Sequence, residues 1–367
     1  MPQKLIRTDP SGAAAPEGDP GGDDAGDTGS WAAPTLRLAR HRLTVDGHQV
    51  TLAVGGCGLP LVLASGLLLT DRLYVQTLGR LAATGFRVVA VDVAGSGLAD
   101  HGHGLDAYGR LLGRTLDELG IGRAVLAGHS LGGRLVTELA ATQPERVVAL
   151  LLVAASVGAP WDDLVRLLVW APPSLGLLGT MLLADTVATI PLARDLQQAA
   201  KLTRLAAPVA AGHLTAPWRL LGPGLSALYA AASAPLLDRI GQAGVPVTVI
   251  HGDGDPVVPL ATARDTARRT AAPLIVVHGA THSFMLQDPE TLPAIIHEEL
   301  AGSLGAACGR AVAAAGLDPA TAEPHSIDQA LTPPGTLIRL LGPPHAPHPA
   351  AAPVTRQPYY RWTTIPA

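Results

Sequence analysis

The chain has 367 residues, a formal net charge of −4 and only 15% charged residues, so it lacks the basic excess of a nucleic-acid-binding protein. Hydrophobic residues make up 48% of it, and the length allows one large folded domain with appendages or two domains, although aromatic residues contribute only 3%. Two cysteines, Cys57 and Cys308, are too few for a disulfide framework, and no spacing of Cys and His predicts a zinc site. A single bridge between these two thiols stays open.

The two ends of the chain differ in composition from its middle. Residues 1–34 are rich in Gly, Ala, Pro and Asp, which predicts a disordered N-terminal arm. Residues 306–367 form an Ala- and Pro-rich extension that closes on the aromatic sequence YYRW, and the sequence leaves open whether this extension covers the body. No apolar run follows the early basic residues Lys4 and Arg7, so no secretory signal is visible and we expect a cytoplasmic protein.

Between these ends, short apolar strands alternate with amphipathic helices. The predicted strands are Gln49–Val54, Pro60–Ala64, Arg87–Val93, Arg123–Ala127, Val147–Val153, Pro246–Ile250 and Leu274–Val277. The predicted helices are Leu73–Thr84, Leu105–Leu119, Leu131–Thr142, Ala261–Thr270 and Thr291–Leu304. This alternation predicts an α/β fold, with a mostly parallel sheet covered by helices on both faces and a core at 35–157 and 239–305.

One stretch, residues 158–238, interrupts the alternation because it is helical, apolar and interspersed with Pro and Gly. We interpret it as an inserted helical lid. Its most apolar part, Leu164–Ala184, is broken by Arg166 and by two consecutive prolines, which predicts two short helices and no transmembrane span. The apolar face of such a lid would allow contact with a membrane surface. The oligomeric state is not indicated.

A serine lies at the junction between a predicted strand and a predicted helix. Here the sequence reads Gly128-His129-Ser130-Leu131-Gly132, which is the pattern GxSxG. The pattern stands between a strand and a helix, the context in which it indicates a nucleophile. A serine on such a sharp turn needs small neighbours, and its hydroxyl lies at the positive end of the following helix. The alternative is a glycine-rich turn in which the serine only caps the helix. The strand before it and the helix after it favour a nucleophile.

These residues carry a family resemblance. GHSLGG at 128–133 resembles the nucleophile elbow of the α/β-hydrolase superfamily, and GFRVVAVD at 85–92 with GSGLAD at 95–100 is similar to a second block of that family. The resemblance extends over residues 43–304. It implies the branch with a serine nucleophile, Ser130, and disfavours the epoxide hydrolase and dehalogenase branches, whose nucleophile is an aspartate.

The resemblance also implies a base and an acid, in the chain order Ser, Asp, His. The loop HGDGDPVVP at 251–259 is similar to the family's acid loop and places the acid at Asp255, with Asp253 as the alternative. His282 lies in a loop just past a strand and is followed by DPE at 288–290, which matches the family's block around the catalytic histidine. A serine needs such a base because its hydroxyl is a poor nucleophile near neutral pH.

The remaining histidines near this region have simpler interpretations. His251 and His278 lie at strand ends, where packing with one ring nitrogen bonded to the backbone is expected. His101 and His103 lie in a glycine-rich loop, and no further metal ligands accompany them.

The oxyanion loop departs from the family pattern. The family has His-Gly after its third strand, whereas this chain has Ser65-Gly66. The resemblance implies that the backbone amides of Leu67 and Leu131 bind the oxyanion, so the substitution affects the shape of the loop and leaves the donors in place.

Three apolar side chains are candidate substrate contacts: Trp170, Met181 and Phe284. The alternative is that they only pack the lid against the body. The predicted substrate is a small, apolar acyl compound.

Together these features predict a serine esterase or lipase-like hydrolase that works through an acyl-enzyme intermediate. No metal and no organic cofactor is required, since the sequence has neither a GxGxxG fingerprint nor a Walker A loop. An amidase, a thioesterase, an acyltransferase and a carbon–carbon bond hydrolase remain alternatives with the same triad. A non-catalytic ligand-binding scaffold is the alternative from a different class, because fold alone does not imply function.

Overall fold

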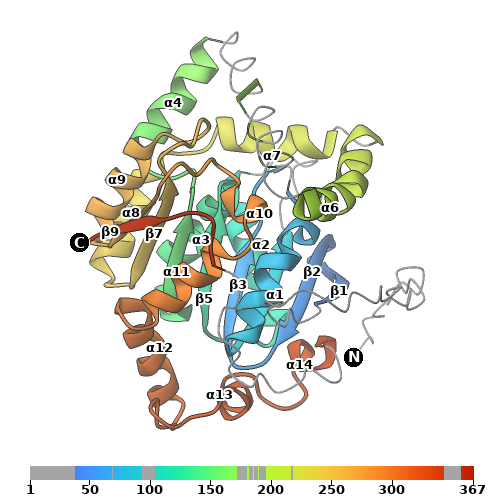
Figure 1. Ribbon diagram of the computed structural model, residues 1–367, viewed down its shortest axis with the longest axis vertical. Helices are drawn as coiled ribbons and strands as arrows, with labels where there is room; N and C mark the ends of the chain where they lie inside the picture. Colours follow the sequence, from blue (N-terminus) through green and yellow to red (C-terminus); the bar gives the residue numbers. More distant parts are fainter. Residues whose placement is uncertain are drawn as a thin grey trace, which may run out of the picture.

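The computed structural model describes residues 38–67, 69–92, 104–171, 180–181, 185, 189, 196–215, 218–342 and 357–367, so the predicted N-terminal arm lies outside the described residues. The described chain forms one nine-stranded sheet in the order β1-β2-β4-β3-β5-β6-β7-β8-β9 (Figure 1). The strands are β1 (Ala39–Val45), β2 (His48–Gly56), β3 (Leu59–Ala64), β4 (Phe86–Asp92), β5 (Ala124–His129), β6 (Val147–Val153), β7 (Val247–Gly252), β8 (Leu274–Val277) and β9 (Trp362–Ile365).

The sheet is mostly parallel, as predicted. The strands from β4 through β3, β5, β6 and β7 to β8 pair in parallel. A hairpin of β1 and β2 joins one side through an antiparallel pairing with β4, and β9 joins the other side antiparallel to β8. The parallel arrangement matters for function because it brings the carboxyl ends of β5, β7 and β8 to the same edge of the sheet.

Helices cover both faces of this sheet, because each central strand is apolar on both sides. Along β3, Val62 and Ala64 pack into one hydrophobic cluster, while Leu61 and Leu63 pack into the other. The first cluster includes side chains of α2 (Leu105–Leu119), α3 (Leu131–Thr142), α8 (Ala234–Gln242), α9 (Leu260–Thr270) and α14 (Leu337–Leu341). The second includes η2 (Asp71–Tyr74), α1 (Val75–Ala83), α10 (Phe284–Gln287), α11 (Thr291–Glu299) and α12 (Ser303–Ala314).

The chain between β6 and β7 carries the helices α4 (Ala159–Trp170), α6 (Leu196–Thr215) and α7 (Trp218–Leu228) before α8. A buried carboxylate ties the two ends of this insertion together. Asp162 in α4 accepts hydrogen bonds from the backbone amides of Ser233 (2.8 Å) and Ala234 (3.1 Å) at the start of α8, and from the Ser233 hydroxyl (2.8 Å). The predicted end of the lid at residue 238 falls inside α8, which packs against α9.

No helix in the described ranges combines the length and the apolar character needed to cross a membrane.

The C-terminal extension folds onto the core over much of its length. After α12 come α13 (Pro324–Leu331) and α14, whose Ile338 and Leu341 are buried. Arg87 of β4 and Asp328 of α13 form a buried two-pronged ion pair, in which Nη2 donates to Oδ2 at 2.7 Å. The alanine-rich sequence of α12 hides that helix, because alanine contributes little apolar area to a recognisable periodic face. The helices α13 and α14 are only eight and five residues long, too short for a clear helical period. Cys57 and Cys308 are both free thiols, so no bridge joins them.

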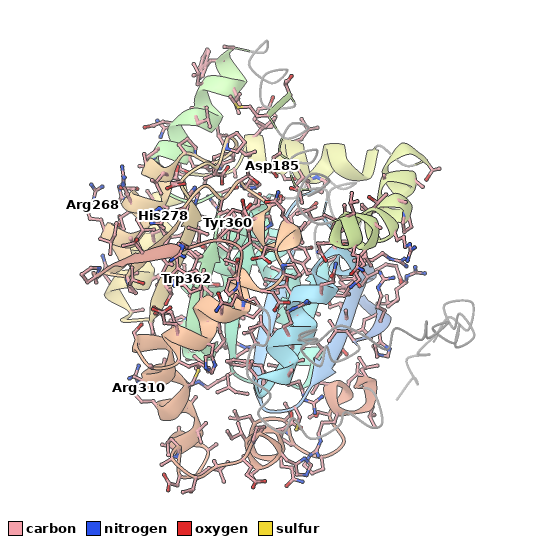
Figure 2. The ribbon with its side chains drawn as sticks, in the orientation of Figure 1. Asp185, Arg268, His278, Arg310, Tyr360 and Trp362 are labelled. Carbon is pink, nitrogen blue, oxygen red and sulfur yellow. The ribbon has the colours of Figure 1, made fainter. Side chains whose placement is uncertain are left out.

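The last residues of the chain form a strand that the sequence does not predict. β9 pairs with β8 along the edge of the sheet, and the Arg361 carbonyl accepts the amide of His278 at 2.8 Å. Figure 2 shows His278, Tyr360 and Trp362 close together beside β9. Tyr360 is buried, and its ring packs edge-to-face on Phe284 at 6.2 Å. The aromatic residues of the predicted tail therefore dock on the domain beside the loop that holds His282.

Candidate active site

Ser130 lies on a strained turn between β5 and α3. Its backbone angles are φ 55° and ψ −122°, a conformation that costs a non-glycine residue about 1–3 kcal/mol. The flanking glycines make the turn possible by close approach. A methyl carbon on Gly132 would lie 2.1 Å from the Ala64 carbonyl oxygen, and one on Gly128 would lie 2.5 Å from the Gly132 carbonyl oxygen. The spacing GxSxG is therefore a steric requirement of this turn.

Two backbone amides at the serine are available to a ligand. Ser130 stands at the N-cap of α3, and its own amide is already bonded to the Val153 carbonyl at 3.2 Å. Among the described residues, the amides of Leu131 and Leu67 donate to no backbone carbonyl. These are the two amides that the resemblance assigns to the oxyanion. Both are free to donate to an added oxygen, and the dipole of α3 favours negative charge at this end.

His282 and Asp255 meet at the carboxyl ends of β8 and β7. Nδ1 of His282 donates to Oδ2 of Asp255 at 2.8 Å, and both side chains are buried. The other carboxylate oxygen of Asp255 accepts the amides of Val257 (2.8 Å) and Val258 (2.9 Å), so the aspartate is fixed in place. Since Nδ1 carries the proton, Nε2 of His282 is the basic atom.

The acid is held in its charged form. Burial raises the pKa of the Asp255 carboxyl, but the hydrogen bond from His282 and the nearby rings of His282 and His251 outweigh burial and leave that pKa below its usual value. The His251 ring is itself buried and donates from Nε2 to the Val258 carbonyl at 2.9 Å, as predicted for a packing histidine. An ionised Asp255 fixes the tautomer of His282 that has a free Nε2.

The free nitrogen of His282 has no hydrogen-bond partner among the described residues, Ser130 included. A buried ring nitrogen without a partner carries a free-energy cost, which is typical of a site that completes its hydrogen bonds with substrate. The ring of His129 packs near the ring of His282, with 5.0 Å between the two ring centroids. The His282 ring therefore lies beside the residue that directly precedes Ser130.

The rival carboxylate, Asp253, has a different partner. It accepts the Gly279 amide at 2.6 Å and pairs with Nδ1 of His278 at 3.0 Å. This pair is exposed, with 36% of the Asp253 side chain and 49% of the His278 side chain accessible. Asp253 therefore acts as a turn carboxylate and not as the partner of His282. The predicted bond from the His278 ring to the backbone is wrong, because both ring nitrogens contact side chains, those of Asp253 and Thr363.

The oxyanion loop is held without the histidine of the family pattern. Ser65 is buried, and its hydroxyl lies 3.4 Å from the Val91 carbonyl and 3.5 Å from Asp92, which are weak contacts. The next amide, that of Gly66, donates to the hydroxyl of Tyr74 at 3.1 Å. Nothing in the sequence pattern singled out Tyr74, because its helical stretch reads as an ordinary core helix.

Comparison with known proteins identifies a family for this chain. The model of the alpha/beta hydrolase family matches residues 61–294, which include Ser130, Asp255 and His282. The chain belongs to the alpha/beta hydrolase family. The match begins within β3 and ends within α11, so the hairpin β1–β2, the helices after α11 and the strand β9 lie outside it.

Relatives of this alpha/beta hydrolase carry several names. It is 36% identical over 254 residues to the "putative non-heme haloperoxidase" of Mycobacterium phage D29, covering 67% of this chain and 88% of that protein. It is 42% identical over 83 residues to a 2-hydroxy-6-oxononadienedioate/2-hydroxy-6-oxononatrienedioate hydrolase of Burkholderia vietnamiensis, covering 22% and 29% of the two chains. An esterase structure from Thermogutta terrifontis matches the fold with TM-score 0.55 and 19% identity, covering 72% and 98%.

The three predicted substrate contacts are scattered in this hydrolase. Trp170 is 86% exposed at the end of α4, so it lines no enclosed pocket. Phe284 is fully buried in the second hydrophobic cluster against Tyr360, which is the position of a core residue. Met181 is half-buried between α4 and α6. The prediction rested on apolar character alone. Phe284 uses that character to pack in the core, whereas Trp170 is exposed to solvent.

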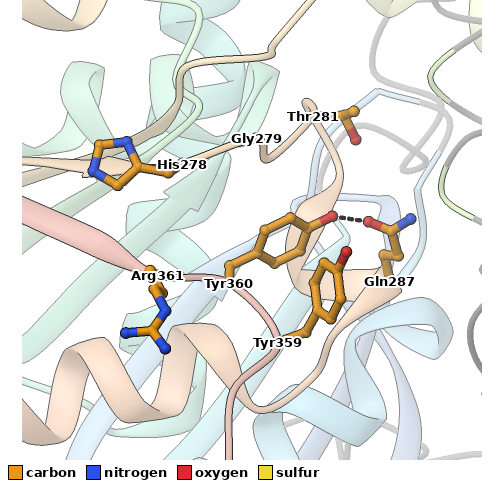
Figure 3. Close-up of a pocket in the computed structure, with 7 residues that line it drawn as sticks. All are labelled: His278, Gly279, Thr281, Gln287, Tyr359, Tyr360 and Arg361. Carbon is orange, nitrogen blue, oxygen red and sulfur yellow. Dashed lines mark hydrogen bonds between the residues drawn. The ribbon is translucent and has the colours of Figure 1, made fainter.

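One cavity of about 470 Å³ opens beside the loop of His282 (Figure 3). Its walls are polar and aromatic, and come from the segment after β8 and from the C-terminal segment: His278, Gly279, Thr281, Gln287, Tyr359, Tyr360 and Arg361. Neither Ser130 nor His282 lines this cavity. The predicted loop histidines His101 and His103 lie outside the described residues.

Proposed function

We propose that this alpha/beta hydrolase is a serine esterase that cleaves a carboxylic ester of a small, apolar substrate through an acyl-enzyme. The observation that carries the proposal is the buried Asp255–His282 pair, whose imidazole lies 5.0 Å from the ring of His129, the residue directly before the strained Ser130. Strain and an unsatisfied buried nitrogen both cost stability, and a catalytic role explains why they occur together. In this proposal no metal and no organic cofactor takes part.

In the first step, Oγ of Ser130 attacks the ester carbonyl carbon while Nε2 of His282 takes the hydroxyl proton. The carbonyl oxygen becomes an oxyanion, which accepts hydrogen bonds from the amides of Leu67 and Leu131. His282 then gives the same proton to the alcohol oxygen, the carbon–oxygen bond breaks, and the acyl group remains on Ser130. Asp255 stays ionised throughout and stabilises the positive charge that forms on His282.

In the second step, water replaces the alcohol. Nε2 of His282 takes a proton from water as its oxygen attacks the acyl carbon, and the same two amides bind the second oxyanion. The proton returns to Oγ of Ser130, and the carboxylic acid leaves.

We also propose that the insertion between β6 and β7 acts as a lid over this site. Support comes from α6, which packs against η2 and α10, the elements next to the oxyanion loop and the loop of His282. The side-chain amide of Gln198 in α6 donates to the Leu286 carbonyl in α10 at 3.3 Å. A cover placed here would exclude water from the acyl-enzyme.

Hydrolysis of p-nitrophenyl esters tests the esterase proposal. We expect a burst of about one p-nitrophenol per enzyme molecule, followed by slower turnover. Ser130→Ala should abolish the burst, while Ser303→Ala, at an exposed serine of α12, should behave as wild type. Acetyl, butyryl and octanoyl esters compared on the same enzyme define the acyl pocket. Equal hydrolysis by Ser130→Ala and wild type would exclude the proposal.

A carbon–carbon bond hydrolase is the second candidate, favoured by the 42% identity over 83 residues to the dienedioate hydrolase of Burkholderia vietnamiensis. The same serine and histidine would then act on a ketone and release a carbon leaving group. Loss of the visible absorbance of a 2-hydroxy-6-oxo-dienedioate distinguishes this candidate. Turnover of that compound with kcat/KM above that of all the esters would favour it over the esterase.

A further inference from the structure

A buried chain of hydrogen bonds runs between the oxyanion loop and the loop of His282. The Gly66 amide donates to the Tyr74 hydroxyl at 3.1 Å. The Tyr74 hydroxyl lies 2.9 Å from Nδ1 of His129, and Nε2 of His129 lies 3.0 Å from the backbone carbonyl oxygen of His282. Tyr74 and His129 are fully buried, so no solvent competes for these bonds.

The chemistry of the end groups fixes the direction of every bond. A carbonyl oxygen only accepts, so Nε2 of His129 must carry the proton that it donates to His282. The neutral ring then has Nδ1 as an acceptor, and the single proton of the Tyr74 hydroxyl points to it. The hydroxyl oxygen of Tyr74 retains a lone pair for the Gly66 amide. Every donor and acceptor in the chain is used once, which leaves one arrangement.

Both side chains keep this arrangement over the whole working range of pH. Burial, with a further contribution from the nearby His282, lowers the pKa of His129 to about 3. Burial likewise raises the pKa of the Tyr74 hydroxyl far above its usual value. The two groups therefore stay neutral while His282 gains and loses protons during catalysis. A connector that never changes charge keeps its geometry during the reaction.

This chain of hydrogen bonds reaches each part of the proposed catalytic site. His129 is the residue immediately before Ser130, Gly66 immediately precedes Leu67, and the far end is the backbone of His282. The oxyanion loop packs closely on the serine turn, since a methyl carbon on Gly66 would lie 3.1 Å from Cβ of Ser130. The helix that carries Tyr74 is itself anchored, because Asp71 accepts two hydrogen bonds from Arg40 at 2.6 and 2.9 Å.

We infer that Tyr74 and His129 are positioning residues that set the distance between the oxyanion donors and the base on either side of Ser130. The inference rests on the proposed serine mechanism. The contacts of the Ser65 hydroxyl are weak, so the hydrogen-bond chain through Tyr74 and His129 is what fixes the oxyanion loop. This explains how the loop keeps its shape without the histidine of the family pattern. Neither residue touches the reacting atoms, so their effect is on kcat through geometry.

Tyr74→Phe tests the inference directly, because it removes one hydroxyl and preserves the ring. We expect kcat for a p-nitrophenyl ester to fall about 10- to 100-fold, with KM changed by less than about threefold. Tyr108→Phe, at another buried tyrosine in the opposite hydrophobic cluster, is the matched control and should retain kcat. Thermal unfolding of each variant shows how much of the folded state is present.

Substitution of His129 separates connection from packing. His129→Gln keeps one donor and one acceptor, whereas His129→Leu keeps the volume and loses both. We expect the Gln variant to retain several-fold more kcat than the Leu variant at equal folded fraction. Because Tyr74 and His129 act in one chain, the double variant Tyr74→Phe/His129→Leu should be little slower than His129→Leu alone.

The outcomes separate this inference from the proposed function. If Ser130→Ala keeps the activity, the serine mechanism itself fails. If Ser130→Ala is inactive while folded Tyr74→Phe keeps the wild-type kcat, the positioning role is overturned and the serine mechanism stands. Equal kcat for folded His129→Gln and His129→Leu, or additive losses in the double variant, would also overturn it.

Discussion

Two aspartate–histidine pairs that hydrogen-bond through Nδ1 lie at the carboxyl ends of β7 and β8, and their local geometry is nearly the same. Asp255 and His282 meet at 2.8 Å, and Asp253 and His278 meet at 3.0 Å, in each case through Nδ1. The two aspartates are two positions apart in one loop and the two histidines are four positions apart in another. The loops therefore build the same contact twice, once facing inward and once facing outward.

The pairs differ in what surrounds them. The inner pair is buried, and no residue that the structure describes binds Nε2 of His282. The outer pair is exposed, and Nε2 of His278 accepts the hydroxyl of Thr363 in β9 at 2.8 Å. The inner pair thus keeps Nε2 of His282 available in a buried site. In the outer pair, Nδ1 of His278 binds Asp253 and Nε2 fastens the C-terminal strand through Thr363. The contact between carboxylate and imidazole is the same in both pairs, and burial and the partner of the second ring nitrogen are what distinguish them.

Asp255→Asn breaks the inner pair, and we expect it to give the largest loss of kcat among these variants. The amide keeps the shape but removes the charge that fixes the tautomer of His282, so kcat should fall about 10³- to 10⁴-fold. Asp253→Asn is the matched control and should stay within about threefold of wild type. Steady-state ester hydrolysis measures both. Equal losses for the two variants would erase the distinction between inner and outer pair.

Removal of residues 357–367 should destabilise the fold more than it slows the chemistry. The deletion exposes the edge of β8 and the buried ring of Tyr360, so we expect a loss of about 2–4 kcal/mol in unfolding free energy and a tendency to aggregate. Urea unfolding measures the loss. Ile365→Thr, which keeps the strand pairing, serves as control. Unchanged stability of the deletion variant would show that β9 is not needed by the fold.

The charge of Asp255 makes stability depend on pH. Burial raises the pKa of its carboxyl, but the bond to His282 dominates together with nearby charges, so the folded-state pKa lies below the unfolded value. The charged form therefore contributes stability above the unfolded pKa of about 3.9, and this contribution disappears as the pH falls through the folded-state pKa. The difference in unfolding free energy between wild type and Asp255→Asn should narrow at the acid end of a titration from about pH 7 to about pH 3. A constant difference would contradict this assignment.

The outer pair should give the smallest effect. Thr363→Val removes the hydroxyl that binds His278, at a cost of about 0.5–1.5 kcal/mol. Amide hydrogen exchange should become faster in β9 and its partner β8, while ester hydrolysis stays within about twofold of wild type. Thr364→Val, at the neighbouring position of the same strand, controls for strand propensity. A large loss of hydrolysis in Thr363→Val would show that the outer pair belongs to the chemistry.

The sequence predicts well those features that depend on residues close together along the chain. The strand-to-helix setting of Ser130 and the alternation of strands and helices depend on neighbouring residues, and the predicted mostly parallel sheet is confirmed. The preference for Asp255 over Asp253 came from alignment alone. The hydrogen bond of Asp255 to His282 depends on how two loops from different strands meet, which no local pattern contains.

The rest depends on contacts between distant parts of the chain. Thr363 lies 85 positions from His278, and Tyr74 lies 55 positions from His129. The strand β9 is short and half polar, so it gains its structure from β8 and not from its own sequence. Trp170 and Phe284 look equally apolar in sequence, yet one is exposed and the other fills the core, because exposure is set by the packing of helices around the sheet.

Covalent labelling at Ser130 tests the account most directly. Wild-type protein treated with a fluorophosphonate should gain the mass of one phosphonyl group, and peptide mapping should place that group on Ser130. Ser130→Ala and Asp255→Asn should label at less than about 1% of the wild-type rate, and Asp253→Asn should label at nearly the wild-type rate. A folded wild-type protein that stays unlabelled, or one labelled at a different residue, would contradict the account.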